Sequence, residues 1–315
     1  MLVIVAPGQG AQTPGFLRPW LEDSVLSARL DWLSAVAGLD LARLGTEADA
    51  DEIRDTRIAQ PLLVSAALVA AEQLHTGADD HGPVAVTGHS VGEIGAAVLA
   101  GVLSAEQAMV LVRERGNAMA EAAAVTPTGM TAVLGGDRDE VLAAIDAAGL
   151  TAANDNGPGQ IVAAGTTSEL EAFAADPPTG GRLRPLAVAG AFHSRHMAPA
   201  VDHVEGLARS VSTVDPHTSF ISNRDGTVAA AGRDVLDRIV GQIARPVRWD
   251  LCLATMVDLG ITGFLELPPA GTLTGIAKRY FRNAGLDVEL LSLNTPDQLD
   301  EARAFCARHT AAVPA

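Results

Sequence analysis

Residues 84–93 read Val-Ala-Val-Thr-Gly-His-Ser-Val-Gly-Glu, and the fold follows from this stretch. A short apolar run ends at Thr87, and a run typical of a helix begins after Gly92. Ser90 therefore stands on a sharp strand-to-helix turn of the form Gly-x-Ser-x-Gly. Glycines are expected at 88 and 92, because a side chain there would crowd the neighbouring strand and helix. The stretch predicts an α/β fold with the Ser90 hydroxyl exposed at the turn.

This turn has two interpretations. In the first, Ser90 is a nucleophile, and the amide of Val91 at the helix N-terminus stabilises an oxyanion. In the second, Gly-His-Ser-Val-Gly is a glycine-rich loop that only leads into a buried helix. The five-residue pattern alone does not separate them.

The composition excludes several classes of protein. The 315 residues are 48% hydrophobic, which suffices for a large core in one big domain or two unequal ones. No segment approaches the roughly 18 uninterrupted apolar residues of a membrane helix. No membrane association is therefore expected. The formal net charge is -16 and Lys278 is the single lysine, so nucleic acid is not an expected partner either.

The N-terminus and the cysteines give further expectations. Residues Met1 to Pro7 have no basic segment before their apolar run, so they predict a strand rather than a signal peptide. We therefore expect a cytoplasmic protein, and we expect it to be a monomer. Cys252 and Cys306 are far apart and lack ligand spacing, which argues against a disulfide framework and against a metal site.

The first strand, Leu2 to Ala6, leads into a tight loop, Pro7-Gly-Gln-Gly-Ala-Gln12. A nucleotide-binding loop is not expected, because Thr13 stands where a glycine is needed and the Walker lysine is absent. The amides of this loop are free to point to the same place as the amide of Val91.

Strands and helices alternate through residues 1–128 and 190–315. Expected helices cover Gln60–His75 (starting at Pro61), Met197–Val211, Val235–Ile243, Trp249–Leu259 and Thr272–Ala284, and expected strands cover Pro83–Thr87, Ser219–Ser222, Ile261–Leu267 and Val288–Leu293. Such alternation predicts a parallel sheet with helices on both faces.

Residues 129–189 show a different pattern. The expected order is strand, helix, strand, strand, helix, strand, at Met130–Leu134, Asp139–Ala148, Thr151–Ala153, Gln160–Ala164, a helix capped by Ser168, and Leu183–Val188. This is the order of a ferredoxin-like unit. We therefore predict a large α/β domain, residues 1–128 and 190–315, with an inserted α+β subdomain at 129–189.

An arginine occupies the apolar face of the helix that a capping box at Ser104 to Gln107 predicts. Arg115 falls on the same stripe as Leu111 and Met119. A buried arginine needs a partner, because an isolated buried charge is very unfavourable. The partner is either a structural carboxylate such as Glu93 or a ligand carboxylate beside Ser90.

A serine nucleophile needs a base, and the chain has eight histidines. His89 adjoins Ser90, but neighbouring side chains diverge at a tight turn, so His89 is expected to support the loop. His193 and His196 stand where the predicted subdomain rejoins the large domain, a boundary that predicts a cleft. The other histidines are expected to be solvated or structural: His75, His81, His203, His217 and His309.

Separate motifs then occur in order along nearly the whole chain: Pro7-Gly8-Gln9-Gly10 with Gln12, Gly88 to Glu93, Arg115-Gly116, Asn154 with Pro158-Gly159-Gln160, Ala191 to Ser194, Ser222-Asn223, and Gln242 with Pro246 to Trp249. Together they resemble the malonyl-CoA:acyl carrier protein transacylases and the acyltransferase domains of polyketide and fatty acid synthases. Two departures from the family pattern, Ile94 and Pro268-Pro269-Ala270-Gly271, bear on the pocket walls.

The resemblance implies an α/β-hydrolase-like core with a ferredoxin-like insert, in agreement with the pattern above. It implies that Ser90 is acylated and that His193 is its general base. The carbonyl of Gln242 would orient the histidine, in place of the aspartate of a hydrolase triad. The amides of Gln9 and Val91 would form the oxyanion hole.

The implied reaction transfers malonyl from malonyl-CoA to the phosphopantetheine thiol of acyl carrier protein, for fatty acid or polyketide synthesis, with no bound cofactor or metal. Arg115 would bind the malonyl carboxylate, and Asn223 is grouped with the substrate-binding residues. Phe192 would narrow the space at the malonyl α-carbon. Val91 stands where relatives that select branched units tend to carry glutamine. These two residues favour unbranched malonyl, unless Phe192 only packs in the core.

Two other functions are considered. A serine hydrolase would use Ser90, but hydrolases of this type place an acid between serine and histidine along the chain. That function leaves Arg115 and Gln242 unexplained. A non-catalytic module that binds carrier protein leaves Ser90 and His193 unexplained.

Overall fold

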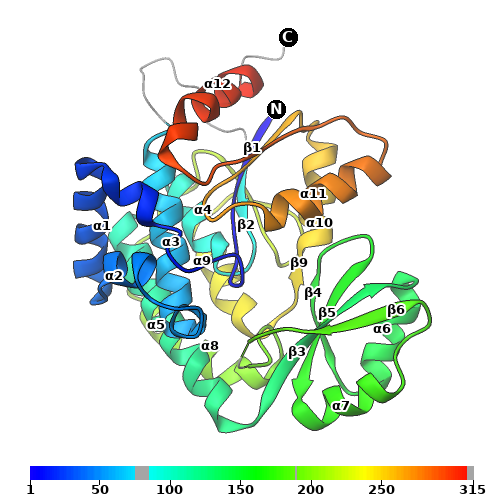
Figure 1. Cartoon of the computed structure of the whole chain (residues 1–315). Coiled ribbons are helices and arrows are strands. Elements are labelled where there is room, and N and C mark those ends of the chain that lie inside the picture. The colour runs from blue at the N-terminus through cyan, green and yellow to red at the C-terminus, as the bar shows by residue number, and fades with distance from the viewer. Residues whose placement is uncertain (75–84, 189, 311–315) are drawn as a thin grey trace.

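Two sheets organise the chain (Figure 1). The structure, a computed structural model, describes residues 1–74, 85–188 and 190–310. The larger sheet contains, in spatial order, β11 (Glu289–Ser292), β10 (Gly263–Glu266), β1 (Leu2–Ala6), β2 (Ala85–Gly88), β7 (Ser219–Ile221) and β8 (Val228–Ala229). All neighbours pair in parallel except β7 and β8. The predicted parallel sheet is confirmed, with one antiparallel strand at its edge.

Alternate side chains of β1 enter two different cores. Leu2, Ile4 and Ala6 belong to the largest cluster, whereas Val3 and Val5 pack in a second one. The largest cluster includes side chains from α1 (Ser24–Ala37), α2 (Leu41–Thr46), α3 (Thr56–Glu72), α4 (Gly92–Leu99), α5 (Ala105–Val125), α8 (Ala198–Ala208), α9 (Gly232–Gly241) and α12 (Leu299–Thr310). The second includes α10 (Trp249–Asp258) and α11 (Thr272–Asn283). Both faces of the central strand are therefore buried.

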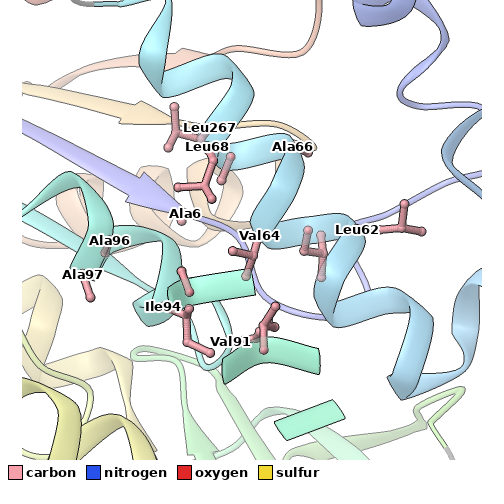
Figure 2. Close-up of a cluster of buried hydrophobic side chains, with 14 of the residues drawn as sticks. Ala6, Leu62, Val64, Ala66, Leu68, Val91, Ile94, Ala96, Ala97 and Leu267 are labelled. Carbon is pink, nitrogen blue, oxygen red and sulfur yellow. The ribbon is translucent and has the colours of Figure 1, made fainter. Parts of the chain in front are cut away.

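The helix after the Ser90 turn is embedded in the largest cluster. Val91 and Ile94 lie with Val64 and Leu68 of α3 and with Ala6 at the end of β1 (Figure 2). Full burial of each such valine, leucine or isoleucine contributes about 1.5–3 kcal/mol. This packing holds the Ser90 turn in place against α3 and the end of β1.

α3 begins earlier than the sequence predicts. Asp55 caps it by accepting a hydrogen bond from the amide of Arg57, and Pro61 lies inside the helix. The predicted start at Pro61 is wrong, because the acidic N-cap Asp55 sets the first turn, and Pro61 lies in the second turn, where its missing N–H leaves one helical hydrogen bond unmade.

Some predictions fall outside the described residues. These are the end of that helix at His75, the start of the next strand at Pro83, the histidine His81, and residue 189 at the predicted domain boundary.

The second sheet has the order β6-β3-β5-β4-β9. Its elements are β3 (Thr128–Gly135), α6 (Arg138–Ala147), β4 (Thr151–Asp155), β5 (Gln160–Thr166), α7 (Thr167–Ala175), β6 (Gly181–Pro185) and β9 (Val247–Arg248). Among the first four strands in chain order, each pair of hydrogen-bonded neighbours is antiparallel, and with the two helices they confirm the ferredoxin-like pattern.

β9 was not predicted. It pairs in parallel with β4 and comes from outside residues 129–189, so the second sheet recruits a strand from the other segment. The division into 1–128 with 190–315 and 129–189 stays a prediction.

Two helix caps had been predicted. The capping box of Ser104 and Gln107 at α5 is confirmed. The cap at Ser168 is wrong, because Ser168 lies within α7 and Thr166 is the N-cap. The Thr166 hydroxyl accepts from the Glu169 amide at 3.2 Å, and the Glu169 carboxylate accepts from the Thr166 amide at 2.7 Å. The Thr-x-x-Glu spacing forms a capping box two residues earlier than expected.

Candidate active site

Ser90 stands on a strained backbone between β2 and α4. Its φ of 55° lies in the left-handed region that residues other than glycine rarely adopt. A Cβ added to Gly88 would lie 2.0 Å from the carbonyl carbon of Gly92, and one added to Gly92 would lie 2.2 Å from the carbonyl oxygen of Ala6. Both glycines are therefore required by close backbone approach.

The Ser90 hydroxyl contacts His193. Its Oγ lies 2.7 Å from Nε2 of the imidazole, whose Nδ1 lies 2.8 Å from the main-chain oxygen of Gln242. Because a carbonyl oxygen only accepts, Nδ1 carries the proton and Nε2 is free to accept from the serine hydroxyl. This is the donor and acceptor pattern of a serine nucleophile and its base, with a carbonyl in place of a carboxylate.

His193 is neutral at neutral pH. The imidazole is buried, and its pKa is lowered to about 3, mainly by the loss of hydration and next by the positive charge of Arg115. The unprotonated Nε2 is thus always present for proton transfer under ordinary conditions.

For the acylation of Ser90 that the resemblance implies, we expect kcat/KM to change little between about pH 7 and about pH 5, because the imidazole of the free protein stays unprotonated there. An imidazole with the ordinary pKa near 6.5 would lower it by about thirtyfold over this range. The measurement is kcat/KM for the acyl donor against pH, with the fold checked by circular dichroism at each pH. A decline centred near pH 6.5 would contradict the neutral, buried base.

The amide of Gln9 lies in the loop that follows β1, and the amide of Val91 lies at the N-cap of α4. The main-chain hydrogen bonds of turns and loops within the described ranges include none donated by either amide. The loop of Gln9 is held by side chains instead: Gln9 Nε2 donates to Thr56 Oγ1 at 3.2 Å, and Gln12 Oε1 accepts from the Gly10 amide at 2.8 Å. The oxyanion hole stays a prediction, and these unengaged donors support it.

Arg115 of α5 is buried and points at Ser90. Its Nη1 donates to Gln60 Oε1 at 2.7 Å, and its Nη2 donates to Gln242 Oε1 at 3.0 Å and to Ser90 Oγ at 3.3 Å. Its Nε is buried without a partner, and among the described residues no carboxylate lies within ion-pair distance of the guanidinium. Glu93 is therefore not a direct partner. Neutral amides hold the cation beside the nucleophile.

Asn223 holds the turn. Its Oδ1 accepts from the Ser90 amide at 2.9 Å, and its Nδ2 donates to the carbonyl of Gly88 at 2.8 Å. The residue is fully buried. In the structure its side chain supports the nucleophile, and the sequence had grouped it with substrate-binding residues.

Two further residues flank the dyad. Phe192 is 6% exposed and belongs to the largest apolar cluster, so its role as a pocket wall stays a prediction. His89 Nε2 lies 2.9 Å from Asn156 Oδ1, and its ring makes an edge contact with Trp249. The expectation that His89 supports the loop agrees with these contacts.

Gln9 lines two cavities. One has a volume of about 200 Å³ and lies between the Gln9 loop, His89 and residues Asn154 and Gln160 of the second sheet. The other has a volume of about 410 Å³ and includes Ile53 and Leu186 in its lining. Both open next to the predicted oxyanion amide of Gln9.

Sequence reasoning missed two parts of this site. The side chain of Gln242 contacts Arg115, whereas only its carbonyl had been predicted to act. Gln60 was also missed, although a glutamine in the apolar run from Ala59 to Val64 is the signal that could have found it.

Two observations concern metals and membranes. In residues 1–74, 85–188 and 190–310, no group of three or more histidine, cysteine, aspartate or glutamate side chains is placed to hold a metal ion. Over the same ranges, no helix combines the length and apolar character needed to cross a membrane.

One family accounts for the whole chain. The sequence model described as "Acyl transferase domain" matches residues 3–313. The chain belongs to the acyl transferase family.

Curated relatives of this acyl transferase have a common name. A protein of Mycobacterium tuberculosis (strain ATCC 25618 / H37Rv), named malonyl CoA-acyl carrier protein transacylase, is 48% identical over 306 residues, which cover 96% of this chain and 99% of the relative. A Bacillus subtilis (strain 168) protein of the same name is 30% identical over 309 residues, 96% of each chain. The resemblance seen in the motifs is confirmed.

Solved structures agree with the sequence comparison. The crystal structure of MCAT from Mycobacterium tuberculosis superposes with a TM-score of 0.91 at 47% identity, covering 96% of this acyl transferase and 99% of that chain. A second structure contains a type II PKS acyl-carrier protein in complex with its malonyl-transacylase. It matches with a TM-score of 0.87 at 28% identity, covering 96% of this chain and 99% of that one.

Proposed function

We propose that this acyl transferase moves the malonyl group from malonyl-CoA to the phosphopantetheine thiol of an acyl carrier protein, through a malonyl ester of Ser90. One observation carries the proposal: Ser90 Oγ lies 2.7 Å from His193 Nε2 and 3.3 Å from Arg115 Nη2. A nucleophile, a base and a cation for a free carboxylate meet at one point. The names of the relatives support the same donor and acceptor.

The first half-reaction acylates Ser90. His193 Nε2 takes the hydroxyl proton while Oγ forms a bond to the thioester carbonyl carbon of malonyl-CoA. The amides of Gln9 and Val91 would stabilise the oxyanion of the tetrahedral intermediate. The carbon–sulfur bond then breaks, and the CoA sulfur takes the proton from His193.

The second half-reaction reverses these steps with a new thiol. His193 takes the proton of the phosphopantetheine thiol, whose sulfur attacks the ester carbonyl. The carbon–oxygen bond breaks, and the proton returns to Ser90 Oγ. The Gln242 carbonyl holds the imidazole in one tautomer through both steps. No bound cofactor is needed for either half.

The acceptor is a carrier protein of fatty acid or polyketide synthesis, and we place the reaction in the cytoplasm. A hydrolase would have to admit water to the ester of Ser90. The pairing of Arg115 with the malonyl carboxylate fixes the acyl group next to the dyad, which favours transfer to a second thiol over attack by water.

Donor selectivity tests this function. Replacement of Arg115 by alanine is expected to lower kcat/KM for malonyl-CoA by about a hundredfold, because the loss of a buried charge pair costs about 2–5 kcal/mol. Acylation by acetyl-CoA, which has no free carboxylate, should fall by less than about threefold or improve. The measurement is kcat/KM for both donors.

Arg113→Ala is the matched control on the same helix. Arg113 bonds to its neighbour Glu114 and to the carbonyl of Val36, away from Ser90. This change should leave the ratio of the two donors as in the wild type. Equal losses for malonyl-CoA and acetyl-CoA in Arg115→Ala would show that the arginine is structural.

A further inference from the structure

A buried carboxylate lies beneath the Ser90 turn. Glu93, in the first turn of α4, is fully buried. Its Oε1 accepts from the amide of Asn223 at 2.6 Å, and its Oε2 accepts from Nε2 of Gln242 at 2.5 Å. The reaction steps above do not use Glu93.

The side chain of Gln242, in the short helix η4 (Gln242–Ala244), joins Glu93 to Arg115. Its Nε2 donates to the carboxylate, and its Oε1 accepts from the guanidinium at 3.0 Å. Arginine only donates, so its contact fixes Oε1 of the amide toward Arg115 and leaves Nε2 facing Glu93. The cation that would bind the donor carboxylate and Glu93 are therefore separated by one amide group.

Other titratable groups face Glu93 from neighbouring helices. Arg238 of α9 already pairs with Asp225 and Asp234, each at 2.7 Å. The thiol of Cys252, on α10, is buried, and the loss of hydration raises its pKa well above the ordinary value, so it stays protonated. Within the described part of the chain, the cluster around Gln242 thus has one cation without a carboxylate partner, Arg115, and one carboxylate, Glu93.

A donor with a free carboxylate brings a second anion to this cluster. Two buried carboxylates would then share one guanidinium, and like charges in a site of low polarity do not both stay ionised. The least unfavourable response is for one carboxyl group to bind a proton. The donor carboxylate pairs directly with Arg115, whereas Glu93 is separated from it by Gln242, so Glu93 is the group that gains the proton.

We propose that Glu93 is protonated whenever a donor carboxylate pairs with Arg115, taking up a proton from solvent if it is ionised in the free enzyme, and that it thereby balances the charge of the buried site for dicarboxylic acyl groups. This inference rests on the proposed function. It makes Glu93 a residue that determines donor specificity without touching the reacting atoms. An acetyl group brings no second anion and causes no such uptake.

The pKa values of these groups also favour Glu93 as the group that binds the proton. Burial raises its pKa to about 8, against the hydrogen bond from Asn223 and the charge of Arg115, which both favour ionisation. The guanidinium of Arg115 keeps its charge at this pH, because burial lowers its pKa only to about 10. The pKa of His193 is about 3, so the imidazole does not compete for the proton.

The proposal predicts the direction in which the selectivity for malonyl-CoA over acetyl-CoA changes with pH. Below about pH 8 Glu93 is mostly protonated and no uptake is needed, whereas above it the free enzyme must first bind a proton. The ratio of kcat/KM for malonyl-CoA to that for acetyl-CoA should therefore fall by up to about tenfold for each pH unit above 8. Glu93→Gln, which has no titrating carboxyl group, should show a ratio that does not vary with pH.

The direct test counts protons. Wild-type enzyme is mixed with malonyl-CoA or acetyl-CoA at about pH 8.5 in weakly buffered solution with an indicator dye, and Ser90 acylation is counted by intact-protein mass spectrometry on the same samples. Both donors release CoA thiol, so the difference between them isolates the carboxylate. We expect about half a proton or more to be taken up per malonyl group beyond the acetyl value, and no difference in Glu93→Gln.

Each outcome bears on a distinct statement. Equal proton changes for the two donors with Ser90 fully acylated, or an excess that persists in Glu93→Gln, would overturn the role of Glu93 and leave the proposed function standing. Absence of malonyl on Ser90 would overturn the proposed function and the inference with it. If Glu93→Gln does not fold, the wild-type ratio decides, because a ratio that is flat from pH 7 to about pH 9.5 contradicts the inference.

Discussion

Replacement of Ser90 by alanine is expected to abolish the malonyl-enzyme and to lower malonyl transfer by at least about four orders of magnitude. In the proposed mechanism the change removes the atom that forms the covalent bond, while the predicted oxyanion amides and Arg115 still bind the donor. Alanine and serine adopt the φ of 55° equally poorly, so the variant should fold like the wild type. The measurement is the rate of transfer to carrier protein, together with the mass of the enzyme after incubation with malonyl-CoA.

Ser210→Ala is the control for this substitution. Ser210 is an exposed serine just after α8, far along the chain from the turn. The Ser210→Ala variant should be malonylated on Ser90 at the wild-type rate. Retention of even a tenth of the transfer rate in Ser90→Ala would exclude a serine ester as the intermediate.

Replacement of His193 by alanine is expected to slow acylation by about two to four orders of magnitude, because general-base assistance is worth that much. Ser90 should still accept malonyl slowly. Without the imidazole, hydroxide must remove the serine proton, so the residual rate should rise with pH where the wild-type rate does not. The measurement is the single-turnover rate of acylation between about pH 6 and pH 9.

His196→Ala provides the matched comparison. It lies three residues away in the short helix η3 (Arg195–Met197), and its Nε2 is buried with no partner in the described part of the chain. Loss of the imidazole at 196 should leave the rate within about threefold of the wild type. Similar losses at 193 and 196 would mean that packing, and not proton transfer, explains the effect.

The turn at Ser90 could be predicted from ten residues because the constraints on its geometry fall on two glycines within that stretch. Gly88 and Gly92 are needed where backbone approaches backbone, and such a requirement is written in the sequence at those positions. The pairing of Ser90 with His193 spans 103 residues and depends on how the second sheet returns the chain to the first. No local pattern encodes that distance. The predicted domain boundary narrowed the base to His193 or His196, and the family resemblance selected His193.

Arg115 shows where position along a helix is not enough. Its place on the apolar stripe of α5 correctly predicted burial, but left two carboxylates as possible partners. The structure places Gln60 and Gln242 against the guanidinium, with Glu93 behind Gln242. Amide partners are hard to foresee, because glutamine carries no charge that demands a complement.

One element of the fold was predicted wrongly and one was missed, and each has a physical reason. Thr166 with Glu169 and Ser168 with Glu171 both have the capping-box spacing, and α7 begins at the first of these two pairs. β9 has two residues and no periodicity of its own, so its pairing with β4 is decided by tertiary contacts. Long apolar segments were predicted more reliably, because burial alone determines them.

The central claim is that Ser90 carries malonyl between two thiols. The most direct measurement is a single turnover with radiolabelled malonyl-CoA, followed by removal of CoA, peptide mapping of the label, and addition of carrier protein bearing phosphopantetheine. We expect the label on Ser90 and then on the carrier thiol, with none on Ser90→Ala. Label on another residue, or its release as free malonate when carrier protein is added, would contradict this account.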